Sequence, residues 1–183
     1  MDGQHWLDDV RARYERYKRN TERAAAQVDD AEFFATVGGN PNSIGVLLKH
    51  VGGNLRSRWR DFLTTDGEKR DRNRDREFEV EGETRESVMA HWAAGWDTAF
   101  TELDKLSLAD LTRTVTVRGA PLSVVAAVHR NLDHVAYHTG QVVFLARALV
   151  GERWQTQSIA RGESDVHNAA MRERYGDWWD ASR

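Results

Sequence analysis

The sequence contains no cysteine, only two prolines and no long apolar run. Without cysteine the fold needs no disulfides, and any thiol chemistry requires a thiol brought by a substrate. No stretch approaches the roughly 18 apolar residues of a transmembrane helix. The first residues also lack the basic segment and apolar run of a signal peptide. We therefore expect a cytoplasmic protein that does not associate with membranes.

Several well-known enzyme motifs are also missing from the sequence. It has no Gly-x-Ser-x-Gly elbow, no phosphate-binding loop and no dinucleotide fingerprint, which argues against a serine hydrolase, an NTPase and a dinucleotide enzyme. The net charge of −3 provides no basic surplus for general nucleic-acid binding. The 183 residues are 40% hydrophobic, which is ordinary for a globular protein. We expect one domain over residues 1–183.

Apolar residues recur at three- and four-residue steps in four long segments. These segments are 4–28, 43–63, 84–106 and 121–150. Four amphipathic helices in one domain predict an all-α four-helix bundle. The connection between the second and third helices is long enough to span the bundle, so these two need not be antiparallel. A shorter helix is expected over 163–175, in an extra C-terminal segment.

Two further segments have distinct patterns. Residues 64–83 carry charges of both signs, which is typical of a solvated loop, although Arg72, Arg74 or Arg76 could instead reach a carboxylate on a ligand. Residues 77–81 alternate polar and apolar, and residues 112–117 are rich in β-branched side chains. These two short segments are candidates for a small β-ribbon in the loops.

Three histidines carry the strongest functional signal. His134 and His138 are four residues apart, so they share one face of the fourth helix. His50 lies in the second helix, and packing of the two helices would bring three neutral imidazoles together. That is the ligand set of an open divalent-metal site. The alternative is that these histidines are core residues with backbone partners.

Other residues near these histidines are candidates for substrate binding or for orienting the imidazole rings. Asn54, Asn131 and Gln141 each lie about one helical turn from a histidine, and ligating imidazoles need partners for their second ring nitrogen. Arg58 follows on the second helix. His91 on the third helix could face the pocket, with an ordinary surface or core role as the alternative.

Gly52 and Gly53 follow His50 within the second helix. Glycine is a poor helix residue, costing about 1 kcal/mol relative to alanine. We expect this pair to let another backbone or a ligand come close, and a local kink is the alternative.

The histidine pattern resembles the DinB/YfiT-like superfamily of metalloenzymes. The shared elements are His50 and the motif His134-x-x-x-His138-x-Gly-Gln141. Residues 50–75 and 154–168 are similar to one uncharacterised branch of that superfamily, which often has proline where this chain has Ala160. The similarity extends over nearly the whole chain.

The resemblance implies an up-down-down-up bundle with a metal held by His50, His134 and His138. Zinc is the usual metal, with nickel, manganese or iron as other choices. Relatives with known activity include bacillithiol S-transferases and mycothiol-dependent isomerases of the maleylpyruvate type, in which the metal activates a thiol. By analogy, we expect a thiol S-transferase that uses a low-molecular-weight thiol and a small-molecule substrate.

Two alternatives differ in chemical class. A metal-dependent hydrolase would need a carboxylate base near a bound water, and Asp133 is the acidic residue that the fourth helix offers. A non-catalytic, stress-linked metal-binding dimer could use Trp154, Trp178 and Trp179 at its interface, although tail aromatics more often cover a core. Similar bundles often form homodimers, and we expect one here.

Overall fold

The computed structural model describes residues 3–39 and 41–176 of the chain. Its contacts divide the chain into two compact units, Met1–Glu152 and Arg153–Arg183. A single domain over the full length stays a prediction.

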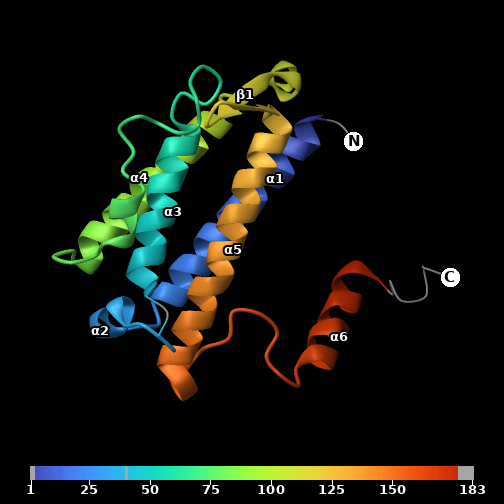
Figure 1. The fold of residues 1–183 in the computed structure, drawn as a ribbon. Helices are drawn as coiled ribbons and strands as arrows, with labels where there is room; N and C mark the ends of the chain where they lie inside the picture. The colour runs from blue at the N-terminus through green and yellow to red at the C-terminus, as the bar shows by residue number, and fades with distance from the viewer. Residues whose placement is uncertain (1–2, 40, 177–183) are drawn as a thin grey trace. The chain divides into compact units, whose positions relative to one another are not determined.

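Among the described residues of the first unit, four long helices form the framework (Figure 1). They are α1 (Gly3–Ala25), α3 (Ile44–Trp59), α4 (Arg85–Leu103) and α5 (Val124–Val150). The predicted all-α fold is confirmed. Ser43, Thr84 and Ser123 cap three of these helices, because each side chain accepts a hydrogen bond from a backbone N–H of the first turn.

The helices run in up-down-down-up order. Tyr14 Oη lies 3.0 Å from Asn131 Oδ1, and Thr21 Oγ1 lies 3.0 Å from Thr139 Oγ1, so α1 and α5 are parallel. Helices α3 and α4 both run in the opposite direction (Figure 1). The order implied by the family resemblance is therefore present.

The core of the bundle is rich in aromatic side chains. Trp59, Trp92 and Trp96 are each 1% exposed, as is Tyr14. The Tyr14 ring meets Trp59 and Trp96 edge to face at centroid distances of 5.9 and 5.8 Å. Such edge-to-face pairs add to the free energy gained from burying the large rings.

Helices α3 and α4 cross with their backbones in contact. A Cβ atom added to Gly95 would lie 2.8 Å from the Cα atom of Gly52, and one added to Gly52 would lie 3.0 Å from the carbonyl oxygen of His91. Only glycine permits this approach. The expected close approach at Gly52 is thus realised by a second helix.

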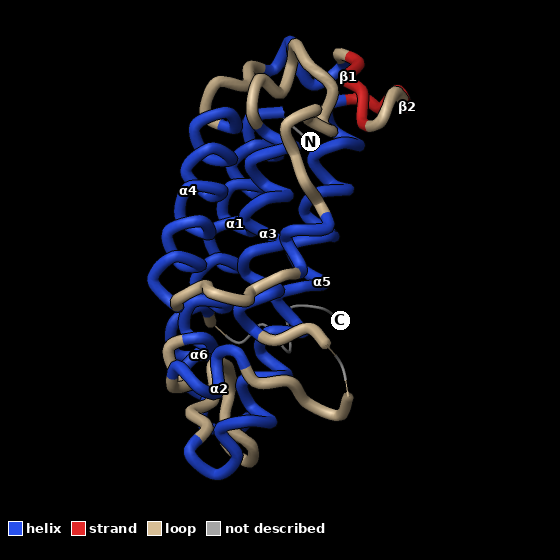
Figure 2. The backbone as a smooth tube through the Cα atoms, turned by 60° about the vertical axis from the view of Figure 1, so that its left-hand side comes forward, coloured by secondary structure: helices blue, strands red, loops and turns tan. Residues whose placement is uncertain are grey.

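A β-hairpin lies at one end of the bundle (Figure 2). Strand β1 (Thr114–Val117) pairs antiparallel with β2 (Ala120–Ser123), and the register places Thr114 opposite Ser123. Arg118 and Gly119 both adopt positive φ angles, of 56° and 76°, as a two-residue hairpin turn requires.

The predicted small ribbon exists, but the pairing expected for it was wrong. Strand β1 pairs with the neighbouring β2 because a two-residue turn closes the hairpin locally. Residues Asp75–Phe78 form the short 3₁₀ helix η1 instead of a strand. The fourth helix was expected to begin at residue 121, but Pro121 lies in β2 and α5 begins at Val124.

The remaining elements of the first unit are α2 (Asp30–Phe34) and the 3₁₀ helix η2 (Leu108–Thr112). The 3₁₀ turn η3 (Gly151–Arg153) follows α5, and the second unit contains α6 (Ser164–Tyr175), the short helix expected near the C-terminus. In the described part of the chain, none of the helices has the length and apolar composition needed to cross a membrane.

Replacing Gly95 by alanine tests the crossing of α3 and α4. We expect Gly95→Ala to lower the free energy of unfolding by about 1–3 kcal/mol, because the methyl group must push the backbones apart. The measurement is urea denaturation followed by circular dichroism. Gly140→Ala is the control, because nothing lies within 4 Å of a Cβ atom at that helical position. Equal stability of the two variants would contradict the close packing.

Candidate metal centre

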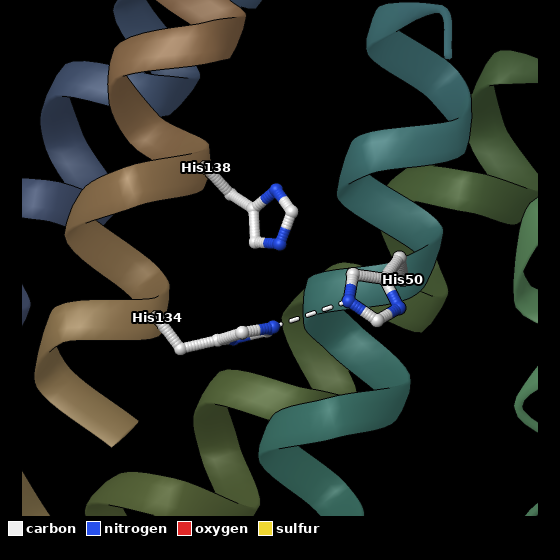
Figure 3. A group of neighbouring side chains, drawn as sticks. All are labelled: His50, His134 and His138. Carbon is white, nitrogen blue, oxygen red and sulfur yellow. Dashed lines mark hydrogen bonds between the residues drawn. The ribbon is translucent and has the colours of Figure 1, made fainter. Parts of the chain in front are cut away.

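His50 on α3 and the pair His134 and His138 on α5 converge at one point inside the first unit (Figure 3). The Nε2 atoms of His50 and His134 are 3.1 Å apart. One nitrogen from each ring lies within 4.8 Å of the other two. The structure therefore brings together the three histidines that the sequence singled out.

The spacing of these nitrogens fits a small divalent cation. Zinc binds imidazole nitrogens at about 2.0–2.1 Å, so neighbouring ligands of a tetrahedral site are about 3.3 Å apart. The His50–His134 pair already has nearly this separation. The third ring, His138, also offers a nitrogen within 4.8 Å of the other two.

His134 and His138 on α5 are neutral near pH 7. Burial, together with the neighbouring imidazoles of His138 and His50, lowers the pKa of His134 to about 3. Burial also lowers the pKa of His138 to about 4, against the opposing effect of its hydrogen bond with Gln141. Neutral imidazole is the form that binds metal, so these rings need lose no proton to ligate a cation.

Hydrogen bonds at Nδ1 set the orientation of two rings. His50 Nδ1 lies 2.9 Å from Glu77 Oε2, and His138 Nδ1 lies 2.7 Å from Gln141 Oε1. Both oxygens are acceptors, so each Nδ1 carries the proton and each Nε2 keeps its lone pair for the common point. Nδ1 of His134 is buried with no hydrogen-bond partner in the described part of the chain.

Glu77 is a candidate site residue that the sequence did not reveal. Its carboxylate is bound by Arg72 through two contacts of 2.8 Å, and both side chains are less than 10% exposed. Burial alone would raise the pKa of Glu77, but hydrogen bonds from His50 and Arg72 hold it below its usual value. Glu77 is therefore an ionised partner for the His50 ring.

Gly53 makes room for Glu77. A Cβ atom at this position would lie 2.7 Å from the Glu77 carboxyl carbon. The glycine pair after His50 was thus the signal in the sequence that another group comes close. The expectation of a solvated loop is wrong for Arg72, which neutralises a carboxylate of the protein itself.

Asn54 and Asn131 form a buried hub next to the histidines. Asn131 Nδ2 donates to Asn54 Oδ1 at 2.9 Å, while Asn131 Oδ1 accepts from Trp59 Nε1 at 2.9 Å and from Tyr14 at 3.0 Å. The hub joins α1, α3 and α5. The two asparagines therefore bind each other and do not hold the imidazole rings, in contrast to Gln141.

A cavity of about 370 Å³ opens beside the histidines. It is lined by His50, Asn54, Arg58, Arg72, Arg74, Arg118, Arg130, Asn131 and His134. No acidic side chain is among the described residues that line it. Asn54, Asn131 and Arg58 thus line this cavity, and their role in binding a ligand stays a prediction.

His91 lies elsewhere. It lines a second cavity of about 300 Å³, which shares Arg72 with the first. Its Nε2 atom is buried without a hydrogen-bond partner among the described residues. The site around His50 therefore does not include His91, because α4 approaches α3 on the face that carries Gly52.

Comparison with protein families places the chain in a family. The family model of DUF1572, a protein of unknown function, matches residues 2–163. The chain belongs to the DUF1572 family. This DUF1572 chain matches no curated protein and no solved structure.

The lowered pKa values of His134 and His138 predict how the stability of the DUF1572 protein depends on pH. The unfolded values are about 6.5, so at pH 5 the unfolded chain binds more protons than the folded one. Stability should therefore fall as the pH decreases from 7 to 5. We expect a shallower fall for the variant with both His134→Asn and His138→Asn.

Urea denaturation of the chelator-treated protein at several pH values measures this effect. Most carboxylates stay ionised over this range in both states, so they contribute little. His167→Asn is the control, since that histidine is exposed on α6. Identical pH profiles for the wild type and the double variant would contradict burial of the two neutral imidazoles.

Proposed function

We propose that this DUF1572 protein is a divalent-metal-dependent enzyme of the DinB/YfiT-like superfamily, and that it is a thiol S-transferase. The observation that supports the proposal is the 3.1 Å approach of the His50 and His134 Nε2 atoms, next to an open cavity. The up-down-down-up order of the helices supports the superfamily.

His50, His134 and His138 would hold the cation, with zinc as the best fit and nickel, manganese or iron as the other candidates. A bound divalent cation favours the thiolate form of a small thiol, whose unperturbed pKa of about 8.5 leaves it mostly protonated at neutral pH. The chain has no cysteine, so the thiol must be a second substrate.

The residues of the chain prepare this site in two ways. Glu77 and Gln141 hold the Nδ1 protons of His50 and His138, which fixes the rings with both Nε2 atoms directed at one point. The cavity beside His50 and His134 leaves one side of the triad open to a substrate. An open side distinguishes a catalytic metal site from a closed structural one.

The hydrolase alternative receives less support. No carboxylate lines the described part of the cavity, and Glu77 is already bound to His50 and Arg72. A general base for a water molecule is therefore missing from the place where it would act. The open cavity likewise favours an enzyme over a purely structural metal-binding dimer.

A homodimer remains part of the proposal. Tyr137 and Phe144 on α5 are 65% and 68% exposed, and exposed aromatic side chains suit an interface. Trp154 is half-buried in the second unit. Trp178 and Trp179 lie outside the described residues.

Metal content tests the ligands and Glu77 together. We expect the protein, purified without an affinity tag, to carry close to one divalent ion per chain by mass spectrometry, and His138→Ala to lose it. Glu77→Gln should bind metal about 10–100-fold more weakly, because the His50 ring loses its anionic partner. Glu79→Gln is the matched control from the same segment. Full occupancy in His138→Ala would disprove the assignment of the ligands.

Activity is tested with a chlorinated aromatic electrophile and a panel of small thiols. Thiolate attack forms a carbon–sulfur bond as chloride leaves, and both thioether and chloride can be measured. We expect turnover that is lost after chelation, restored by added zinc and absent in His50→Ala. Turnover that survives chelation, or none with any thiol, would count against the S-transferase.

A further inference from the structure

Five arginines from separate parts of the chain surround the cavity beside the histidines. Arg58 comes from α3, Arg72 and Arg74 precede η1, Arg118 lies in the hairpin turn, and Arg130 lies on α5. The whole chain has a net charge of −3, so the positive charge around this cavity is opposite in sign to the net charge of the protein. The cavity therefore concentrates positively charged side chains in one place.

The protein neutralises only part of this charge. Glu68 is shared by Arg58, Arg72 and Arg118 at distances of 2.9, 3.3 and 3.1 Å. Glu77 also forms an ion pair with Arg72. Two carboxylates thus form ion pairs with three guanidinium groups.

Arg74 and Arg130 have no carboxylate partner among residues 3–39 and 41–176. Arg74 packs over the ring of Phe78, with its guanidinium carbon 4.9 Å from the ring centre. Both side chains belong to exposed residues at the cavity. Their guanidinium groups are therefore available to a ligand.

Arg58 is a buried member of this group. It is only 8% exposed and donates to the carbonyl oxygen of Gly67 as well as to Glu68. Burial lowers the pKa of Arg58, the hydrogen bond and charge of Glu68 oppose this effect, and the positive charges of Arg72 and Arg130 lower the pKa further. Like charges held together in this way repel one another, and an anion in the cavity would relieve that repulsion.

The arginines and the histidines share one space. His50 and His134 line the same cavity of about 370 Å³, which lies within the usual range of roughly 300–1,000 Å³ for small-molecule sites. A ligand bound by the arginines would therefore lie next to the open side of the triad. Guanidinium groups bind carboxylate and phosphate oxygens in paired hydrogen bonds.

We propose that this cavity binds a carboxylate or phosphate group, and that the substrate reaching the three histidines is an anionic small molecule. Arg130 and Arg74 contact the anion directly, while Arg58, Arg72 and Arg118 maintain the positive potential around it. The role as a substrate site rests on the proposed function. The binding of an anion by the arginines does not.

Isothermal titration of the protein as purified tests the anion site. The probes are inorganic phosphate and succinate, with neutral succinamide as the matched control ligand. We expect at least one anion to bind and succinamide not to bind. Arg130→Gln and Arg74→Gln should each weaken anion binding about tenfold or more, as expected for loss of a charged hydrogen bond.

A matched variant separates a specific site from general charge effects. Arg147→Gln removes an exposed arginine from the same helix as Arg130, outside this cavity, and should leave the affinity unchanged. Arg130→Lys should recover part of the lost affinity. Equal binding of succinate and succinamide, binding of neither anion, or an unchanged affinity in Arg130→Gln would overturn the inference.

Metal analysis of the same samples separates this inference from the proposed function. A wild type that holds a metal but binds neither anion overturns only the anion site. A wild type that binds succinate or phosphate through Arg130 without any metal supports the anion site and counts against the metal enzyme.

Discussion

The organisation of the site depends on the buried ion pair between Arg72 and Glu77. Glu77 fixes the His50 ring, and a lone carboxylate at this depth would be costly to ionise. Arg72 removes that cost with two hydrogen bonds, and Gly53 leaves the space in which the carboxylate sits. The charged segment 64–83 is thereby anchored to the bundle, although most of its sequence is typical of a solvated loop.

A second polar network sets the alignment of the helices around the histidines. Asn131 links Tyr14, Trp59 and Asn54, so α1, α3 and α5 meet at one level of the core. Every donor and acceptor in this network must find its partner, so a sliding of one helix by a turn would leave buried polar groups unpaired. The register that satisfies Asn131 is also the register that places His50 opposite His134.

Much of the framework could be predicted from the sequence, because helical periodicity and capping residues are local signals. The i, i+4 spacing of His134 and His138 is local as well, and it pointed to His50 as the third ligand once the helices were assumed to pack. The partnership of Glu77 with His50 could not be found in this way, since an irregular loop brings the two together. The position of Arg118 and Arg130 at one cavity could not be predicted either, because the first lies in the hairpin turn and the second on α5. The alternation in residues 77–81 was misleading, because Glu77 and Phe78 belong to η1 and the buried side chain of the segment is the charged Glu77.

The DUF1572 chain thus combines neutral imidazoles, a buried anionic partner and an arginine-lined cavity in one place. X-ray absorption spectroscopy at the zinc edge of the zinc-loaded protein tests the central claim most directly. We predict three imidazole nitrogens at about 2.0–2.1 Å and one further light atom that exchanges when a small thiol is added. A spectrum without imidazole scattering, or a zinc ion bound through fewer than two imidazoles, would contradict convergence of the three rings on one cation.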